Sequence, residues 1–171
     1  MAEPATPEDL FAFLDTLGIE TKTVTHPPLF TVEDSRALRG DLPGGHTKNL
    51  FLKDKKGRLF LVTCDESRKV NLKALEKAIG AARVSFGKPE LLLEILGVTP
   101  GAVTTFSLIN DRGEAPRVTF AIDAALLKHD LIYCHPLHNE ATTAISSEDL
   151  MRFVDACGHP ALQVDFEGLE A

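Results

Sequence analysis

Residues 44–63, GGHTKNLFLKDKKGRLFLVT, predict a β-hairpin. Two apolar segments, NLFLKD and RLFLVT, flank the turn KKG at residues 55–57, which places glycine where a positive φ is favourable. Hairpin strands pair in antiparallel fashion, so this stretch argues against a doubly wound parallel sheet. Lys48 and Asn49 stand where a glycine-containing loop becomes the first strand. They are either an exposed strand end or a ligand-facing pair on a rigid element.

Outward from the hairpin, hydrophobic spacing and capping residues divide the chain into short helices and strands. Helices are expected at residues 7–17, 31–39, 71–79, 89–96 and 147–157. Strands are expected at residues 19–25, 82–86, 104–109, 117–122, 131–134, 141–145 and 161–166. The segments TTFSLI and RVTFAI, separated by a turn signal, predict a second hairpin. The mixed order indicates an α+β (mixed α/β) fold with an antiparallel-rich central sheet and flanking helices.

The composition is that of one soluble domain. The 171 residues fit a single domain, 1–171, and 44% hydrophobic residues are enough for a substantial core. No apolar run approaches the ~20 residues that a membrane-spanning helix needs, and residues 1–4 do not resemble a signal peptide. Three cysteines without a CxxC spacing favour a reduced protein. We therefore expect a cytoplasmic location and no membrane partner.

The charge distribution limits the kind of nucleic-acid binding that is expected. A formal net charge of −7 argues against broad, nonspecific binding, which needs many phosphate contacts. A local basic cluster nevertheless surrounds the hairpin: Lys48, Lys53, Lys55, Lys56, Arg58, Arg68 and Lys69. Such a cluster is either a solvated hairpin face or a local site for an anionic ligand.

Common catalytic and cofactor-binding motifs are absent: the chain has no GxSxG, GxxxxGK[ST], GxGxxG or HExxH. The segment CHPLH at 134–138 offers three potential metal ligands, but no second cluster completes a ligand set. We therefore expect structural or substrate-contacting histidines, no metal and no cofactor. Three loops combine glycine or proline with polar residues beside strands, at 44–49, 97–103 and 135–143. Each of these loops alone is compatible with an ordinary turn.

Together, three segments resemble a known family. They are TKNLFLKDKKGRLFLV, LGVTPGAVTTFSLIND and HPLHNEATTAIS. The resemblance is to the YbaK-like aminoacyl-tRNA deacylases, which are related to the editing domain of bacterial prolyl-tRNA synthetase. It extends from HPPLFTVEDS to the final helix and is strongest to the alanyl-tRNA(Pro) deacylase (ProX) branch. It implies the editing-domain fold, in which an antiparallel-rich, barrel-like sheet is flanked by helices.

The resemblance also implies roles for particular residues. Lys48 matches the essential lysine of the family and Asn49 its neighbour, both near the terminal adenosine and the scissile ester. Residues implied to bind the substrate are Phe30, Thr31, Gly101, Ala102, His138 and Asn139. One departure is Ser107, near which the family has a glycine, and we expect serine to narrow or stiffen the pocket there.

The implied activity is hydrolysis of mischarged Ala-tRNA(Pro) by water, without a metal. The implied partners are the tRNA acceptor end and prolyl-tRNA synthetase. Strand alternation would send Lys48 and Asn49 to opposite faces unless the loop bends, so either both or only Lys48 contacts the ester. Alternative activities are deacylation of Cys- or Ser-tRNA, metal-dependent hydrolysis through His135 and His138, and tRNA binding without catalysis.

Overall fold

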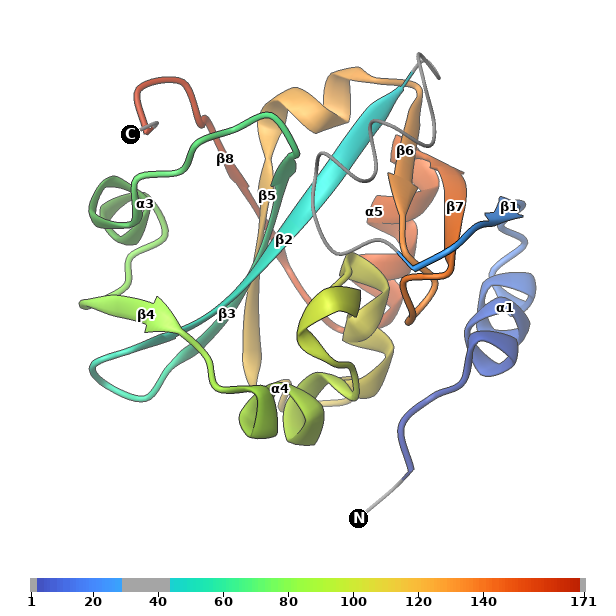
Figure 1. The fold of residues 1–171 in the computed structure, drawn as a ribbon, viewed down its shortest axis with the longest axis horizontal. Coiled ribbons are helices and arrows are strands. Elements are labelled where there is room, and N and C mark those ends of the chain that lie inside the picture. Colours follow the sequence, from blue (N-terminus) through green and yellow to red (C-terminus); the bar gives the residue numbers. More distant parts are fainter. Residues whose placement is uncertain (1–2, 29–43, 170–171) are drawn as a thin grey trace.

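The computed structural model describes residues 3–28 and 44–169, which form a central sheet surrounded by helices (Figure 1). The α-helices are α1 (Pro7–Thr16), α3 (Leu72–Ala78), α4 (Pro89–Leu96) and α5 (Ser147–Ala156). The 3-10 helices are η1 (Pro100–Ala102), η2 (Thr105–Asn110) and η3 (Ala124–Lys128). The strands are β1 (Lys22–Thr25), β2 (Gly45–Asp54), β3 (Leu59–Asp65), β4 (Val84–Phe86), β5 (Val118–Asp123), β6 (Leu131–Cys134), β7 (Ala141–Ser146) and β8 (Ala161–Val164). Within the described ranges, no helix is long and apolar enough to cross a membrane.

The strands form one mixed sheet. Their order is β1-β7-β6-β2-β3-β5-β8, and β4 also pairs with β2. The β1–β7, β6–β7, β2–β3 and β2–β4 pairs are antiparallel, whereas the β2–β6, β3–β5 and β5–β8 pairs are parallel. In the part of the chain that is described, β1 and β8 end the order without pairing to each other, so the sheet is not closed. The predicted mixed α/β fold with flanking helices is confirmed, and the expected barrel-like curvature stops short of a closed barrel.

The hairpin predicted from residues 44–63 is confirmed as β2 and β3. Its register pairs Lys48 with Cys64 and Asn49 with Thr63. Gly57 adopts a φ of +83° in the connecting turn, a conformation that glycine reaches without a steric cost. The first six residues of β3 are buried, as expected for a central strand covered on both faces.

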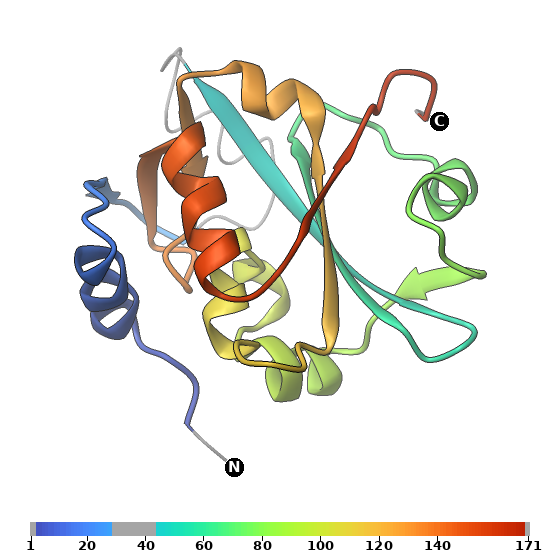
Figure 2. The ribbon, with the colours of Figure 1, turned by 180° about the vertical axis from the view of Figure 1, so that it is seen from behind.

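Two apolar cores cover the faces of the sheet. The larger core joins α1, α4, η2 and α5 to one face, and Phe106 of η2 meets Phe153 of α5 edge-to-face at 5.3 Å between ring centroids. The smaller core packs Leu75 of α3 against Leu52 and Val62 on the other face. Figure 2, which shows the molecule from behind, has α5 lying over the strands and α1 beside it. Both faces are thus fixed by packing, which makes β2 a rigid support.

The second predicted hairpin is wrong, because TTFSLI forms η2 and not a strand. The hydroxyl of Thr104 accepts the N–H of Phe106, and Ser107 Oγ accepts the N–H of Thr104, each at 3.3 Å. Such bonds offer the backbone a helical alternative to a strand ladder. All residues from Thr105 to Ile109 are buried, so polar and apolar alternation does not reveal an outer face. β5 pairs in parallel with β3 instead. The helix predicted at 31–39 lies outside the described residues.

Candidate active site

Lys48 and Asn49 lie beside an interruption in the pairing of β2. One edge of β2 pairs with β3 along residues 47–53. The other edge pairs with β6 at residues 45–46 and with β4 at residues 52–54. Among the described strands, the intervening residues therefore have a partner on one side only. On this edge, the interruption in pairing between described strands therefore spans residues 47–51.

The two residues point to opposite faces of the sheet, as strand alternation predicts. Asn49 is on the face of Phe51, which belongs to the larger core, and Lys48 is on the face of Leu52, which belongs to the smaller core. Both residues lie within regular β2, so no loop bend turns them to the same side. The two side chains therefore have different partners, and a shared ligand would have to reach both across the edge of β2.

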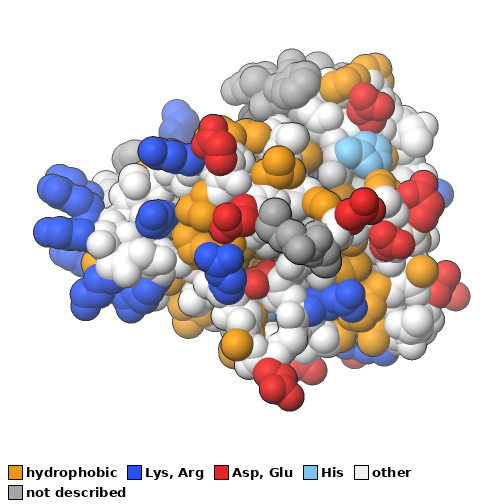
Figure 3. Space-filling model, turned by 90° about the horizontal axis from the view of Figure 1, so that it is seen from below, with side chains coloured by type: hydrophobic (Ala, Val, Ile, Leu, Met, Phe, Trp, Pro, Cys, Tyr) orange, Lys and Arg blue, Asp and Glu red, His pale blue; other side chains and the backbone are white. Residues whose placement is uncertain are grey.

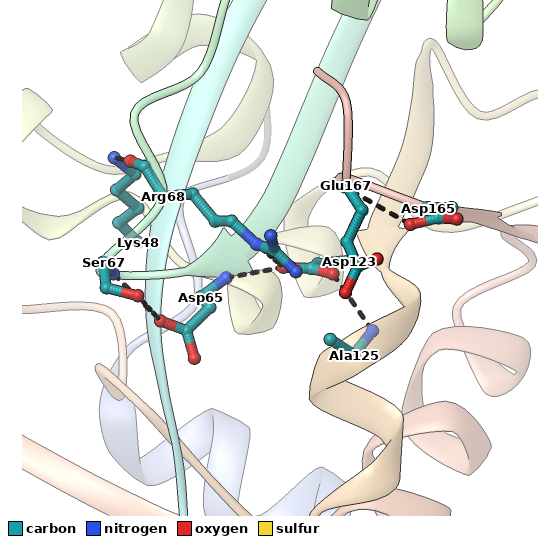
Figure 4. Close-up of polar contacts among 8 residues, drawn as sticks. All are labelled: Lys48, Asp65, Ser67, Arg68, Asp123, Ala125, Asp165 and Glu167. Carbon is teal, nitrogen blue, oxygen red and sulfur yellow. Dashed lines mark hydrogen bonds and ion pairs between the residues drawn. The ribbon is translucent and has the colours of Figure 1, made fainter. Parts of the chain in front are cut away.

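The ammonium of Lys48 is held by the backbone of another loop. Its Nζ donates a hydrogen bond to the carbonyl of Arg68, in the connection that follows β3 (Figure 4). The Arg68 side chain runs the other way, and its Nε lies 3.1 Å from Oδ2 of Asp123 at the end of β5. Lys48 is partly buried, so its position is defined by strand packing and by this carbonyl.

The carboxamide of Asn49 is fixed by buried hydroxyl groups. Thr63 Oγ1 donates to Asn49 Oδ1 at 2.6 Å, and Thr63 Oγ1 lies 2.8 Å from Thr105 Oγ1. Because Thr63 has one hydroxyl proton and gives it to Asn49, Thr105 donates the second bond. Both threonines are fully buried. The amide nitrogen of Asn49 is consequently turned away from Thr63, as a donor group.

Cys134 extends this arrangement to a third loop. Burial raises the pKa of Cys134 to about 12, although hydrogen bonding with the side chains of Thr47 and Thr105 opposes the shift. Thr47 also donates to the carbonyl of Tyr133 at 2.7 Å. The start of β2, the start of η2 and the end of β6 are therefore joined by side chains. Burial in this environment disfavours the thiolate of Cys134 and makes it a poor nucleophile.

The HPLHN loop follows Cys134 directly. His135 Nδ1 donates to the carbonyl of Ala141 at 3.1 Å, and burial lowers the pKa of His135 despite that bond. His138 Nδ1 accepts the N–H of Glu140 at 3.1 Å, so the neutral ring carries its proton on Nε2. These bonds shape the loop. Among the described residues, no three His, Cys, Asp or Glu side chains gather to hold a metal ion.

The glycine loop forms η1, which contains Gly101 and Ala102. Gly101 is partly exposed, whereas Ala102 is buried in the larger core. Ser107 is fully buried, and its hydroxyl accepts the N–H of Thr104. The serine at this position therefore caps η2, a local role that the sequence comparison with the family did not reveal.

Sequence reasoning placed some site residues and missed others. Phe30 and Thr31 lie outside the described residues, and Asn139 is in the HPLHN loop. The supporting residues Thr63, Thr105 and Asp123 were missed. Each is polar within an apolar segment, and that signal could have singled them out, because a buried polar side chain needs a partner.

A basic groove of about 800 Å³ lies between β4 and α4. Four exposed basic side chains line it, Lys53, Lys55, Arg83 and Lys88, together with two exposed acidic side chains, Glu90 and Glu94, and the buried Asp54. Figure 3 shows Lys and Arg side chains gathered at the end of the molecule that carries the β2–β3 turn. Two other members of the predicted cluster, Arg58 and Arg68, form ion pairs with carboxylates instead. The groove also contains Phe86, which is 62% exposed.

The family model of the aminoacyl-tRNA editing domain matches residues 26–153, a range that includes β2, η1 and the HPLHN loop. This chain belongs to the aminoacyl-tRNA editing domain family. The resemblance read from the three sequence segments is therefore confirmed. The match also covers the hydroxyl-linked residues around Asn49, so the site described above lies within the editing domain.

Relatives of this editing domain are associated with prolyl-tRNA synthetase by name. A mouse protein named prolyl-tRNA synthetase associated domain-containing protein 1 is 40% identical over 159 residues, which cover 90% of this chain and 92% of the relative. The prolyl-tRNA editing protein ProX of Acetoanaerobium sticklandii is 36% identical over 151 residues, covering 88% and 91%. A crystal structure described as a proposed trans-editing enzyme for prolyl tRNA synthetase superposes with a TM-score of 0.68 at 18% identity, covering 94% and 98%, and supports the fold.

Proposed function

We propose that this protein is a trans-editing hydrolase that deacylates mischarged Ala-tRNA(Pro) at the tRNA 3′ end. Membership of the editing-domain family supports the substrate class. The relative named as the prolyl-tRNA editing protein ProX supports tRNA(Pro) as the tRNA that carries the wrong amino acid. The tRNA acceptor end is the main partner, and prolyl-tRNA synthetase is the enzyme whose errors are corrected.

The observation that carries the proposal is the junction of three loops around Asn49. Buried hydroxyls connect Asn49 through Thr63 and Thr105 to η2, and Cys134 connects η2 to the HPLHN loop. Lys48 lies on the opposite face at the same interrupted edge. This arrangement supports the proposal, because a cation and an amide donor held on a rigid strand can position an ester and stabilise developing charge.

The proposed reaction is direct attack by water on the ester carbonyl. Water oxygen bonds to the carbonyl carbon, the bond to the ribose oxygen breaks, and the ribose oxygen takes the proton. The Lys48 ammonium binds phosphate or stabilises developing negative charge, and Asn49 bonds to ribose hydroxyls. Backbone donors around Gly101 stabilise the oxyanion, while the loop of His138 and Asn139 lines the other side. The 2′-hydroxyl of the substrate helps to position the water, and no metal takes part.

Selectivity for alanine follows from size. A synthetase pocket that fits proline admits the smaller alanine, because each missing methylene costs only ~1–3 kcal/mol of discrimination. An editing pocket bounded by the Gly101 and His138 loops rejects the proline ring by overlap. We place Ser107 outside direct substrate contact, since its hydroxyl caps η2.

The basic groove provides a second contact for the tRNA. Lys53 shares its face of β2 with Asn49, four residues away, or about 13 Å along the strand. Phosphates next to the acceptor end would then meet Lys53, Lys55 and Arg83, and the exposed ring of Phe86 offers a stacking surface. A local groove of this kind allows an acidic protein to bind RNA despite its net charge of −7.

A deacylation panel tests the proposal. The purified protein is incubated with Ala-, Ser-, Cys- and Pro-tRNA(Pro), and the remaining ester is measured over time. Rapid loss of Ala-tRNA(Pro) with intact Pro-tRNA(Pro) is expected. Equal rates for alanine and proline would refute the editing role, and a preference for serine or cysteine would assign the chain to another specificity.

Two other classes of function are separated by simple controls. A tRNA-binding module would bind the acceptor end without single-turnover hydrolysis, a reading that fits relatives named only as associated-domain proteins. A metal-dependent hydrolase using His135 and His138 would lose activity with a chelator and regain it with zinc. We expect activity to survive chelation, because among the described residues no third His, Cys, Asp or Glu side chain joins these two histidines to complete a ligand set.

A further inference from the structure

Asp123 ties the connection after β3 to the end of β5. Its Oδ2 accepts the N–H of Asp65 and Nε of Arg68, both at 3.1 Å, and its Oδ1 accepts the N–H of Ala125 at 3.0 Å (Figure 4). Asp123 is fully buried, and the Arg68 side chain is 15% exposed. One carboxylate therefore holds both the first and the last residue of segment 65–68.

The same segment is also braced from within. Asp65 Oδ1 accepts the N–H of Ser67 at 2.9 Å and its hydroxyl at 2.6 Å. With its ends tied to Asp123 and its interior closed by Asp65, the segment has little freedom to move the Arg68 carbonyl. That carbonyl is the acceptor for the Lys48 ammonium.

We propose that Asp123 and Arg68 are positioning residues that set the direction of the Lys48 ammonium for the reaction. This inference rests on the proposed function. An ammonium has three N–H bonds, and fixing one of them on the Arg68 carbonyl limits where the other two point. The Arg68 guanidinium is neutralised by Asp123, so the loop presents a carbonyl dipole to Lys48 and not an unbalanced positive charge.

The variant Asp123→Asn separates the two parts of this arrangement. An amide replaces one acceptor oxygen with a donor nitrogen, and both oxygens of Asp123 accept N–H groups. In either orientation of the asparagine side chain, its NH₂ group therefore faces an N–H group that the Asp123 carboxylate would have accepted. Arg68→Met is the second variant, because it removes the ion pair but keeps the backbone carbonyl and an apolar stem of related length.

Single-turnover deacylation of Ala-tRNA(Pro) is measured for both variants, alone and combined with Lys48→Ala. We expect the chemical rate to fall on the order of tenfold to a hundredfold, with little change in the concentration dependence, because small misplacements of a reacting group have effects of this size. In the Lys48→Ala background neither variant should lower the remaining rate further. An undiminished rate in both single variants, or an equal fall in the presence and absence of Lys48, would overturn the proposal.

A matched control is Asp111→Asn, because the Asp111 carboxylate follows η2 and binds the backbone at the start of β5. Asp111 is a buried carboxylate that accepts the N–H groups of Arg117 and Val118, each at 2.9 Å. Asp111→Asn should lower the melting temperature as Asp123→Asn does but leave the deacylation rate unchanged. A comparable loss of rate in Asp111→Asn would show that general destabilisation suffices, and would count against the proposal.

A readout without substrate keeps the inference separate from the proposed function. In isotope-labelled protein, the scalar coupling from Lys48 Nζ to the Arg68 carbonyl carbon reports their hydrogen bond. We expect this coupling in the wild type and in Asp111→Asn, and its loss in Asp123→Asn and Arg68→Met. If the coupling persists in both Asp123→Asn and Arg68→Met, the positioning claim is wrong. A wild type without deacylase activity would instead refute the function, while the coupling still reports the geometry.

Discussion

The hydroxyl of Thr63 donates to Asn49 Oδ1 at 2.6 Å across the β2–β3 ladder. These residues are directly opposite in the register, so their side chains share a face. The bond decides which end of the Asn49 amide is turned outward. A catalytic or binding role of Asn49 as a donor therefore depends on a buried residue that does not itself reach the surface.

Replacing the hydroxyl of Thr63 should impair both stability and activity. Thr63→Val keeps the shape but leaves Asn49 Oδ1 and the Thr105 hydroxyl without their shared partner. Leaving buried polar groups unpaired costs about 1–3 kcal/mol. We expect that loss in urea unfolding and a roughly tenfold slower deacylation from a less ordered amide.

Thr63→Ser is the matched control, because it retains the hydroxyl and removes only a methyl group. It should stay close to wild type in rate even if it is somewhat less stable. A Thr63→Val protein as active as Thr63→Ser would show that the orientation of Asn49 does not matter for the reaction.

Lys48→Ala should remove most deacylase activity. The ammonium is the cation at the interrupted edge of β2, and loss of one group that stabilises developing charge typically costs about 100-fold or more. The melting temperature should fall only modestly, since Lys48 is partly exposed and, among the described residues, its ammonium makes one hydrogen bond, to the Arg68 carbonyl. Lys48→Arg should also be slow, because the planar guanidinium is larger and cannot make the same contact with the Arg68 carbonyl. Near-normal turnover by folded Lys48→Ala would remove Lys48 from the mechanism.

The carboxylate of Asp54 should make the stability of the folded protein sensitive to acid. Burial alone would raise its pKa, but hydrogen bonds from the N–H groups of Ala82 and Arg58 and from the Arg58 guanidinium outweigh this and lower the pKa from 3.8 to about 2. Because the folded-state pKa lies below the unfolded one, the stabilisation is complete above about pH 4 and is lost as the pH falls towards about 2.

The comparison that checks this is urea unfolding of wild type and Asp54→Asn across that pH range. The stability advantage of the wild type should shrink on acidification, as protonation removes the carboxylate that the four donors require. A difference that stays constant down to about pH 2 would contradict the assigned shift.

The three cysteines should be unreactive in the folded protein. Burial raises the pKa of Cys64, Cys134 and Cys157 to about 12 in each case. Alkylation requires the thiolate, so iodoacetamide at mildly alkaline pH should modify the native protein very slowly and the unfolded protein quickly. Mass spectrometry of the intact chain counts the adducts. Rapid single-site labelling of native protein would show that one of these thiols is more accessible than its burial indicates.

The strands and helices marked by local sequence signals, such as a turn glycine or a capping residue, were predictable from the sequence. The β2–β3 hairpin follows from two apolar runs and a glycine turn, and the helices α1 and α5 follow from capping residues at Thr6 and Ser146. η2 was not predictable in this way, because its residues are buried on all sides and the choice between strand and helix was made by packing and by the Thr104 cap. Polar and apolar alternation carries no signal in such a fully buried segment, whereas β3, which is also buried, was predictable because a glycine turn links it to β2.

The sequence by itself determined the family, the hairpin that carries Lys48 and Asn49, and the opposite directions of these two side chains, because alternation along a strand is a property of the backbone. The tertiary structure decided which distant residues support them. Asn49 depends on Thr63 and Thr105, and Lys48 depends on a carbonyl that Asp123 holds from 55 residues beyond Arg68. Thr63 lies opposite Asn49 in the antiparallel hairpin, so that pair follows from the hairpin register. Thr105 in η2 and Asp123 at the end of β5 come from later segments, and only the folding of the whole chain brings them beside β2 and β3, because no local spacing encodes those contacts.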